Sequence, residues 1–359
     1  MRRALTLAAQ GRGYTSPNPM VGAVIVRDGA IVGEGFHPAV GQPHAEAHAI
    51  READGRTQGS TMYVSLEPCG LHGRTPPCTE ATIAAGITRV VVAMTDPDPG
   101  VSGKGIERLR ASGITVEVGL LETEARRLNA AYIHHRQTGK PFVLLKLAQT
   151  LDGKVATCTG QSQWITGREA RTRSHQMRCE SDGVLVGVGT VLADDPELTV
   201  RHVGGRQPRR IVLDSTGRTP VNARIFSTGE APPVIYMTDR APNARRVALH
   251  QAGAQCLTLP SSEDGHVDLQ ALLEDLGKRE IMTLMIEGGS RVATAFLKEQ
   301  AVHRIACFIA PKLLGTGLSA IGNLNISTLD SAINLREITI ERSGDDILVE
   351  GFIDYTNDP

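Results

Sequence analysis

The sequence predicts an α/β protein built as two domains. Short apolar segments typical of strands alternate with amphipathic segments typical of helices along most of the 359 residues. A short polar stretch, 138–141, contains Gly and Pro and interrupts a predicted helix. We therefore expect one domain over residues 1–139 and a second over residues 142–359, each with a sizeable core.

The composition argues against several classes of function. The chain has 38 Lys and Arg against 39 Asp and Glu, which argues against a nucleic-acid-binding surface spread over the whole protein. Aromatic residues make up 3%, too few for a platform that stacks single-stranded nucleic acid. The start of the chain lacks the apolar core of a signal peptide, and no apolar run approaches membrane-spanning length. The six cysteines are thinly scattered, so we expect reduced thiols and a cytoplasmic protein.

The elements expected in the first domain follow from periodicity and turn residues. Segments 21–26 and 31–35 read as strands that flank Asp28-Gly29, a pair typical of a hairpin turn. The other expected elements are a helix near 5–9, a turn at 16–19, helices over 44–53, 78–85, 104–111 and 121–137, and strands over 61–66, 89–94 and 115–118.

The most specific motif of the chain combines His44, Glu46, Cys69 and Cys78. The first two fall in the first turn of an expected helix, Cys69 follows a strand, and Cys78 begins the next helix. Thiolates and neutral imidazole suit Zn²⁺, and a catalytic zinc site keeps three protein ligands. The order H-x-E and then P-C is typical of zinc deaminases, in which the Glu transfers protons. The second cysteine, however, lies nine positions after the first rather than three.

Simpler interpretations of this motif carry less weight. A lone His-x-Glu is usually a solvated helix start, and a lone buried Cys is usually a small apolar filler. The combination of all four residues, with Pro68 and Pro77 directly before the cysteines, is hard to obtain by chance. A structural zinc site would normally use four protein ligands, and only three are evident here. The sequence therefore favours a catalytic zinc site.

The second domain carries charge in unusual places. Its first strand, 142–148, is apolar apart from Lys146, which either emerges to solvent at a strand end or contacts a substrate. The helix expected over 167–178 has a basic face that includes Arg171 and Arg178 and is either solvated or binds phosphate.

Glycines follow two further strands of this domain. A strand over 184–190 runs into a glycine turn, and a strand over 281–286 is followed by Glu287-Gly288-Gly289 and a helix. Such a turn can cradle an anion with backbone N–H groups, although a plain strand–helix turn looks the same. We expect the Gly288-Gly289 turn and Thr190 together to form a pyrophosphate site. No Gly-x-Gly-x-x-Gly fingerprint opens the domain, so a Rossmann domain is not supported.

Motifs in both halves resemble the bifunctional deaminase–reductase family of riboflavin biosynthesis. The first half carries Ser16-Pro-Asn-Pro-Met-Val-Gly-Ala, Pro43-His-Ala-Glu46 and Leu66-Glu-Pro-Cys-Gly-Leu-His-Gly-Arg-Thr-Pro-Pro-Cys78, whose long insert separates this family from general cytidine deaminases. The second half carries Lys146-Leu-Ala-Gln-Thr-Leu-Asp-Gly153, Ser162-Gln-Trp-Ile-Thr166, Thr190-Val-Leu-Ala-Asp-Asp-Pro196, Leu198-Thr-Val-Arg201, Glu287-Gly-Gly289 and Ala310-Pro-Lys-Leu-Leu-Gly315. The resemblance implies a cytidine-deaminase-like three-layer domain followed by a dihydrofolate-reductase-like α/β domain.

For the first domain, the resemblance implies deamination of 2,5-diamino-6-(5-phosphoribosylamino)pyrimidin-4(3H)-one. Zn²⁺ held by His44, Cys69 and Cys78 would lower the pKa of its water towards ~7, and Glu46 would move protons.

The resemblance also places three residues of this domain on the substrate. Asn18 and His37 would contact the pyrimidine, and Arg74 the phosphate or ribose. The sequence departs from the family at Leu71, where His is more frequent, and this leaves the role of the neighbouring His72 open.

For the second domain, the resemblance implies NADPH-dependent reduction of the ribosyl chain of 5-amino-6-(5-phosphoribosylamino)uracil to ribityl. Arg178 and Arg201 suit the 5′-phosphate, because guanidinium binds phosphate bidentately. Asp194 and Lys146 are the polar residues expected near the reduced carbon, and which of them, if either, moves a proton stays open. The cofactor residues implied are Ala148, Trp164, Thr190, Asp194, Ser215, Gly289, Ser290, Arg291, Val292, Ala293, Thr294 and Ala295. The substrate residues implied are Lys146, Ser162, Arg178, Leu198, Arg201 and Glu287.

The resemblance further suggests a homodimer or homotetramer formed through the second domain. Three rival functions are a deaminase whose second domain is only a scaffold, a deaminase that edits tRNA or DNA, and a zinc-stabilised binding protein. The editing enzyme would need a basic, aromatic-rich surface, which this composition lacks.

Overall fold

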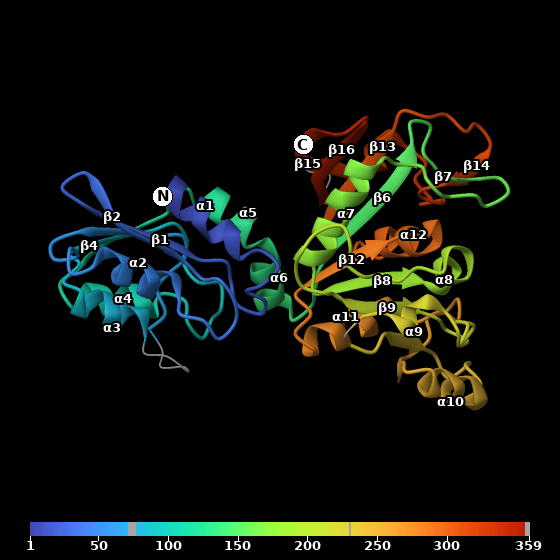
Figure 1. Ribbon diagram of the computed structural model, residues 1–359, viewed down its shortest axis with the longest axis horizontal. Coiled ribbons are helices and arrows are strands. Elements are labelled where there is room, and N and C mark those ends of the chain that lie inside the picture. Colours follow the sequence, from blue (N-terminus) through green and yellow to red (C-terminus); the bar gives the residue numbers. More distant parts are fainter. Residues whose placement is uncertain (71–76, 230, 356–359) are drawn as a thin grey trace. The chain divides into compact units, whose positions relative to one another are not determined.

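The computed structural model describes residues 1–70, 77–229 and 231–355. The chain divides into two compact units, Met1–Gly139 and Lys140–Pro359. Figure 1 shows the helices and strands of each unit. Both units combine a β-sheet with helices packed against it, which confirms the predicted α/β class.

The first unit contains a five-stranded sheet in the order β2-β1-β3-β4-β5. Its strands are β1 (Gly22–Arg27), β2 (Ala30–Phe36), β3 (Thr61–Val64), β4 (Arg89–Val92) and β5 (Thr115–Val118). β1 pairs antiparallel with β2 and β3, whereas β3, β4 and β5 run parallel. Parallel neighbours need crossover connections. Two helices make these crossovers, α3 (Cys78–Ala84) and α4 (Lys104–Ala111).

The sheet of the first unit is covered on both faces. Alternate residues of β1 point to opposite faces, so Ala23 and Ile25 pack in the core with α2 (Ala45–Ala53). Val24 packs instead with Ala4 and Leu7 of α1 (Arg2–Ala8), a helix that continues as the 3₁₀ turn Ala9–Gly11. The three-layer arrangement brings the starts of α2 and α3 to one side of the sheet (Figure 1).

Two glycines in β2 let α2 lie directly on the strand. A Cβ at Gly33 would stand 2.2 Å from the Ala49 carbonyl oxygen, and a Cβ at Gly35 would stand 2.4 Å from that of Ala45. Any larger residue would therefore push α2 away from the sheet. His44, the residue before this helix, owes its place to that close packing.

The helix expected over 121–137 is two helices, α5 (Glu122–Leu128) and α6 (Ala130–Thr138). They meet at Asn129, whose backbone leaves helical geometry at φ −100° and ψ 22°. The Asn129 side chain accepts a hydrogen bond from the Met20 backbone nitrogen and donates one to the Met20 oxygen. A tertiary contact to a residue 109 positions away thus interrupts a continuous helical pattern.

The second unit contains a nine-stranded sheet in the order β11-β10-β9-β8-β12-β6-β13-β16-β15. The six strands from β11 to β6 are parallel, β13 is parallel to β6, and β16 and β15 are antiparallel additions. The bounds are β6 (Phe142–Thr150), β8 (Gly183–Gly187), β9 (Arg209–Leu213), β10 (Val234–Met237), β11 (Gln255–Thr258), β12 (Thr283–Glu287), β13 (Arg304–Ala310), β15 (Asn334–Ser343) and β16 (Asp346–Asp354).

Helices cover both faces of this sheet. One core contains Phe296 of α12 (Ser290–Lys298) and Leu276 of α11 (Leu269–Lys278). The other contains Met177 of α7 (Arg168–Glu180) and Leu249 of α10 (Asn243–Gln251). The remaining elements are the two-stranded arm of β7 (Lys154–Thr157) and β14 (Gly317–Ser319), the short helix α9 (Arg224–Ser227) and the 3₁₀ turn Leu329–Ser331.

The strand expected over 184–190 is shorter than predicted. β8 ends at Gly187, and the chain continues as α8 (Val188–Asp194). Val188 and Val191 are buried three residues apart on this helix. A short apolar run cannot distinguish a strand from a buried helical turn, which explains the error.

The parallel strands of the second unit end at one edge of the sheet. Successive strands β8, β9, β10 and β11 extend the sheet in one direction, and β12 then inserts between β8 and β6. Ligands of open α/β sheets bind at such a reversal of strand order. In the described part of the chain, no helix is both long and apolar enough to cross a membrane.

Candidate metal centre and ligand cavity

Three side chains of the first unit form a compact group of metal-ligand type, His44, Cys69 and Cys78. Their candidate ligand atoms all lie within 4.8 Å of one another. His44 Nδ1 lies 3.2 Å from Cys78 Sγ and 3.7 Å from Cys69 Sγ. A tetrahedral Zn²⁺ with ordinary Zn–S and Zn–N bonds would separate such atoms by roughly 3.5–3.8 Å. The donor set and its spacing therefore fit zinc.

The elements of the fold deliver these ligands. His44 caps α2 with an extended backbone at φ −73° and ψ 165°, and Cys78 is the first residue of α3 after Pro77. The Cys78 backbone nitrogen donates to Cys69 Sγ at 3.3 Å. Hydrogen bonds from the Cys78 thiol and from His44 lower the pKa of the Cys69 thiol to about 4, and the same shared proton raises the pKa of Cys78. Cys69 is thus held as the thiolate that a soft cation binds.

Glu46 lies beside the ligand group but outside it. It is in the first turn of α2 and is only 3% exposed. Burial, together with the charge of Cys69, raises the pKa of its carboxyl group to about 7. A buried carboxyl group with such a pKa is suited to exchange protons with a reacting group near neutral pH.

A second buried carboxylate, Glu67, holds the loop that carries Cys69. Its Oε2 accepts hydrogen bonds from the backbone nitrogens of Asp96 and Gly103, and its Oε1 from those of Gly105 and Ile106, at 2.9–3.3 Å. The packing here leaves no room for a side chain, because a Cβ at Gly105 would stand 2.0 Å from the Pro68 oxygen. Sequence reasoning assigned Glu67 no role, although a Glu before Pro-Cys and a glycine-rich loop downstream were the available signals.

His37 lies next to the metal centre, with its ring centre 5.3 Å from that of His44, and Asn18 contacts His37. His37 Nε2 lies 3.1 Å from Asn18 Nδ2, and His37 Nδ1 lies 3.2 Å from the Pro43 oxygen. His37 is 2% exposed, and burial lowers its pKa. Its Nδ1 donates to the Pro43 oxygen, because a carbonyl oxygen can only accept. Both ring nitrogens are then engaged, and His37 orients the Asn18 amide. Arg74, Leu71 and His72 lie outside the described residues.

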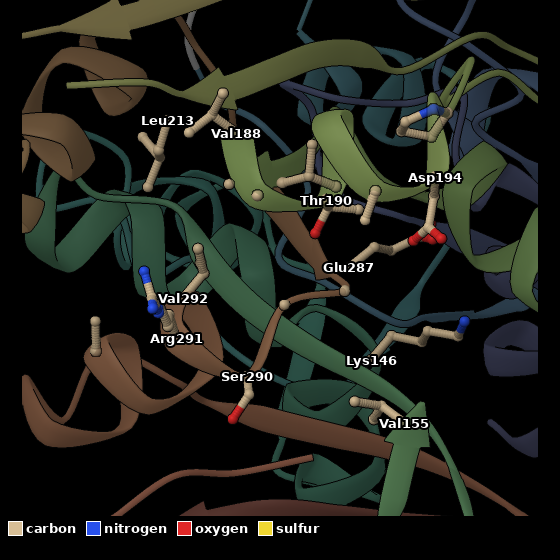
Figure 2. A pocket seen from close by; sticks show the side chains of 18 of the residues that line it. Lys146, Val155, Val188, Thr190, Asp194, Leu213, Glu287, Ser290, Arg291 and Val292 are labelled. Carbon is tan, nitrogen blue, oxygen red and sulfur yellow. The ribbon is translucent and has the colours of Figure 1, made fainter. Parts of the chain in front are cut away.

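The second unit holds a cavity of about 1540 Å³ along the carboxyl ends of its parallel strands. Figure 2 shows side chains that line it. Its volume exceeds the ~300–1,000 Å³ of an ordinary small-molecule pocket and suits two ligands together. Most residues implied for cofactor and substrate line it: Lys146, Ala148, Ser162, Trp164, Arg178, Thr190, Asp194, Leu198, Arg201, Ser215, Glu287, Gly289, Ser290, Arg291, Val292 and Ala295.

Two of the implied cofactor residues are not among the lining residues. Ala293 is 1% exposed and belongs to the core between α12 and the sheet. Thr294 Oγ1 donates to the Ser290 oxygen and accepts from the Gly322 nitrogen. Both therefore stabilise the helix rather than face the cavity.

Lys146 and Glu287 face each other across neighbouring parallel strands inside this cavity. Burial lowers the pKa of Lys146, while the charge of Glu287 opposes that shift. Lys146 is half-buried in the middle of its strand, so it is not a solvated strand end. Figure 2 shows Lys146, Glu287 and Asp194 gathered on one side of the cavity.

Arg178 is fully engaged within the protein. Its Nε and Nη2 donate to the two carboxylate oxygens of Glu287, and its Nη1 donates to the Thr199 oxygen at 2.9 Å. The neighbouring Arg201 is more available, with 44% of its side chain exposed, although Nη1 donates to Glu197. The structure thus leaves Arg201 better placed than Arg178 to meet a phosphate.

The mouth of the cavity carries the single Trp of the chain. Trp164 is 63% exposed, and the Arg171 guanidinium stacks 4.5 Å above its ring centre. Lys312 Nζ donates to the backbone oxygens of Trp164 and Ile165 at 2.9 and 2.6 Å. Ser162, in the same loop, donates to Asp194 at 2.7 Å. The loop is therefore tied both to the cavity wall and to the segment that follows β13.

Two consecutive glycines form the turn between β12 and α12. Gly288 and Gly289 both have positive φ, at 64° and 75°, a region that side chains rarely adopt. A Cβ at either position would stand 3.1–3.2 Å from Thr190 Oγ1. The turn thus exposes backbone N–H groups next to a hydroxyl at the reversal of strand order, which is the geometry of an anion cradle.

Both units match known protein families. Residues 141–349 match the RibD C-terminal domain, and residues 1–94 match the cytidine and deoxycytidylate deaminase zinc-binding region. The riboflavin biosynthesis protein RibD of Aquifex aeolicus is 47% identical, with 97% of this chain and 96% of the relative covered. This chain belongs to the RibD family.

Further relatives extend the RibD assignment over nearly the whole chain. RibD of Escherichia coli is 42% identical, with 97% of this chain and 96% of that protein covered. A solved structure of Acinetobacter baumannii RibD has a TM-score of 0.87 at 38% identity, with 98% of this chain and 97% of that one covered. A Thermotoga maritima structure, described as a diaminohydroxyphosphoribosylaminopyrimidine deaminase and 5-amino-6-(5-phosphoribosylamino)uracil reductase, has a TM-score of 0.85 at 37% identity, with 99% and 97% covered.

Proposed function

We propose that the first unit deaminates 2,5-diamino-6-(5-phosphoribosylamino)pyrimidin-4(3H)-one and that the second reduces the ribosyl chain of the resulting 5-amino-6-(5-phosphoribosylamino)uracil to ribityl. One observation carries the proposal. The same RibD-family chain holds a three-ligand metal centre with a buried carboxyl group beside it, and a cavity large enough for a dinucleotide and a substrate.

In the first step, His44, Cys69 and Cys78 would hold the zinc ion. Zinc, when bound, lowers the pKa of a water to ~7 and so makes it a nucleophile at neutral pH. Glu46 would take a proton from the attacking water and return one to the departing ammonia. Asn18, oriented by His37, binds the pyrimidine edge.

In the second step, the cavity holds NADPH, which supplies the hydride. The Gly288-Gly289 turn and Thr190 would hold its pyrophosphate, and the exposed Trp164 at the mouth of the cavity offers an apolar face to the bound cofactor. Arg201 binds the substrate phosphate. Lys146 and Asp194 line this part of the cavity, and either could give the proton that the imine nitrogen takes up as its neighbouring carbon receives the hydride. The paired Arg178 and Glu287 fix the wall behind them.

The proposal also covers location and assembly. Cytoplasmic location is supported by the thiol ligands, which a reducing compartment keeps free for the metal. A homo-oligomer formed through the second unit is supported by the edge strand β15, where Ile338 and Ile340 are 54% and 70% exposed.

The deaminase assignment is tested by measuring zinc content and ammonia release from the diamino substrate. Glu46→Gln is expected to keep the zinc and to slow ammonia release by about 10²- to 10⁴-fold, the usual contribution of a general acid–base group. The matched control is Glu107→Gln, which alters an exposed glutamate in the first turn of α4. Ammonia release by Glu46→Gln at the rate of the control would refute the assignment.

A further inference from the structure

The cofactor direction across the cavity follows from the order of the strands. The pyrophosphate cradle lies where β8 meets β12. Lys146 lies on β6, one strand to the side of that point, and pairs with Glu287 at the end of β12. A dinucleotide bound with its nicotinamide at this pair must extend its adenosine half the other way, over the ends of β9 and β10. Figure 2 places Leu213, at the end of β9, on the side of the cavity opposite Lys146.

That far end of the cavity carries two exposed arginines, Arg218 and Arg240. Within the described residues, Arg218 forms no hydrogen bond or ion pair. Arg240 makes a single hydrogen bond, from Nη1 to the Gly265 oxygen at 2.8 Å. Two carboxylates, Asp264 and Asp268, also line this end, and Asp268 is engaged in capping α11. Neither forms an ion pair with the arginines, which remain available to an anion.

The loop that presents Arg218 is firmly held. Asp214 accepts hydrogen bonds from the backbone nitrogen and hydroxyl of Thr219 at 2.7 and 2.8 Å. Arg245 donates to the Gly217 and Thr219 oxygens at 2.7 and 2.6 Å. Arg218 therefore projects from a short turn that is fixed on both sides, which reduces the entropy lost on binding an anion.

Hydrogen bonds also join the Arg218 turn to the loop that carries Arg240. Thr238 donates from its hydroxyl to the Ser215 oxygen at 2.8 Å, and the Val267 nitrogen donates to Ser215 Oγ at 3.1 Å. Thr238 precedes Arg240 by two residues, and Ser215 precedes Arg218 by three. The two guanidinium groups thus belong to neighbouring loops that these hydrogen bonds join.

We propose that Arg218 and Arg240 bind the 2′-phosphate of the cofactor and make this cavity selective for NADPH over NADH. The proposal rests on the reductase function given above and adds the residues that read the cofactor. An arginine close to the adenosine ribose is the usual means by which dinucleotide sites accept a 2′-phosphate. Guanidinium groups bind phosphate through paired, charge-assisted hydrogen bonds.

The test measures binding to the full chain rather than turnover. Dissociation constants are determined for NADPH and NADH, and for the fragments 2′,5′-ADP and 5′-AMP, which differ by the 2′-phosphate alone. The variants are Arg218→Ala and Arg240→Ala, and the control is Arg342→Ala, an exposed arginine of β15 that does not line the cavity. Each variant is expected to weaken NADPH and 2′,5′-ADP by about tenfold or more, the equivalent of one lost charged hydrogen bond. Binding of NADH and 5′-AMP should stay unchanged.

Four results would count against the proposal. Equal weakening of NADPH and NADH, or unchanged NADPH binding in both variants, would overturn the assignment of the arginines and leave the reductase function standing. Wild-type protein that binds NADH as tightly as NADPH would overturn it as well. Wild-type protein that binds neither nucleotide would overturn the reductase function, and the inference with it.

Discussion

Arg178 and Glu287 form a bidentate pair in the wall of the reductase cavity. Arg178 Nε and Nη2 donate to the two Glu287 carboxylate oxygens at 2.5 and 2.8 Å, across 109 positions of sequence. The side chains are 12% and 9% exposed. Burial alone would raise the pKa of Glu287, but the charge and hydrogen bonds of Arg178, with help from Lys146, lower it to about 2.

Removing one partner of this pair should destabilise the protein more than removing both. Arg178→Met leaves a buried carboxylate without its main partner, at a cost of about 3–5 kcal/mol. The double variant Arg178→Met with Glu287→Gln removes both charges and should recover part of that loss. Denaturant unfolding of the two variants and the wild type measures the difference. A double variant less stable than Arg178→Met would contradict the assignment of a buried ion pair.

The same pair should make the protein acid-sensitive. The pKa of Glu287 is lower in the folded than in the unfolded chain, so its stabilisation is complete above the unfolded value of about 4.5 and is lost as pH falls towards 2. By pH 3.5 the wild type should lose about 1 kcal/mol that Glu287→Gln does not lose. Unfolding free energies from pH 6 to pH 3.5 compare the two slopes, and parallel slopes would show that the carboxylate is not depressed.

Glu67 should control zinc retention without touching the metal. Glu67→Ala removes the acceptor for four backbone N–H groups and frees the loop that carries Cys69. Zinc affinity should fall by about 10- to 100-fold, as for other residues that hold metal ligands in place. Glu67→Gln keeps one carbonyl oxygen for two of these N–H groups and should restore part of the affinity. Competition with a chelator gives both values. If Glu67→Ala holds zinc as tightly as the wild type, Glu67 does not position Cys69.

Close packing at Gly35 should be needed for the metal centre. Gly35→Ala places a methyl group 2.4 Å from the Ala45 oxygen and forces α2 outward, an overpacking that costs about 1–3 kcal/mol. Zinc content should fall with stability, because His44 caps the displaced helix. Gly204→Ala is the control, since nothing lies within 4 Å of its added Cβ. A Gly35→Ala protein with wild-type stability and zinc content would show that α2 accommodates the added methyl group without a loss of stability.

Fluorescence should report on the loop at the cavity mouth, because Trp164 is the single Trp of the chain. Bound NADPH should quench its emission in the wild type. Lys312→Met removes two hydrogen bonds to the Trp164–Ile165 backbone and should weaken the quenching at saturating cofactor. The control is Lys298→Met, which changes a lysine that lines the cavity. Equal quenching in both variants would mean that Lys312 does not position the loop.

The first unit could be predicted in some detail because its signals are local. His44, Cys69 and Cys78 each follow or begin an element whose end is marked by proline or by a change of periodicity, so the sequence indicated that they meet. The role of Glu67 was missed, since its partners lie 29–39 residues further along the chain and its local signals do not say which groups it binds.

Arg178 illustrates the corresponding limit in the second unit. Residue type suggested a phosphate ligand, but the structure engages all its donor nitrogens with Glu287 and Thr199. Arg218 and Arg240 carried no motif, and only the strand order brings them to one end of the cavity. Contacts between residues far apart in the sequence decide whether a charged side chain is free to bind a ligand. A local sequence pattern does not reveal these contacts.

The central claim, that one chain carries two separable and consecutive activities, is tested most directly by complementation. Glu46→Gln and Asp194→Ala proteins are incubated with the diamino substrate and NADPH, singly and mixed, and the ribityl product is measured. We expect Glu46→Gln alone to oxidise no NADPH, Asp194→Ala alone to release ammonia without NADPH oxidation, and the mixture to form the ribityl product. Ribityl product from Glu46→Gln alone, or none from the mixture, would contradict the account.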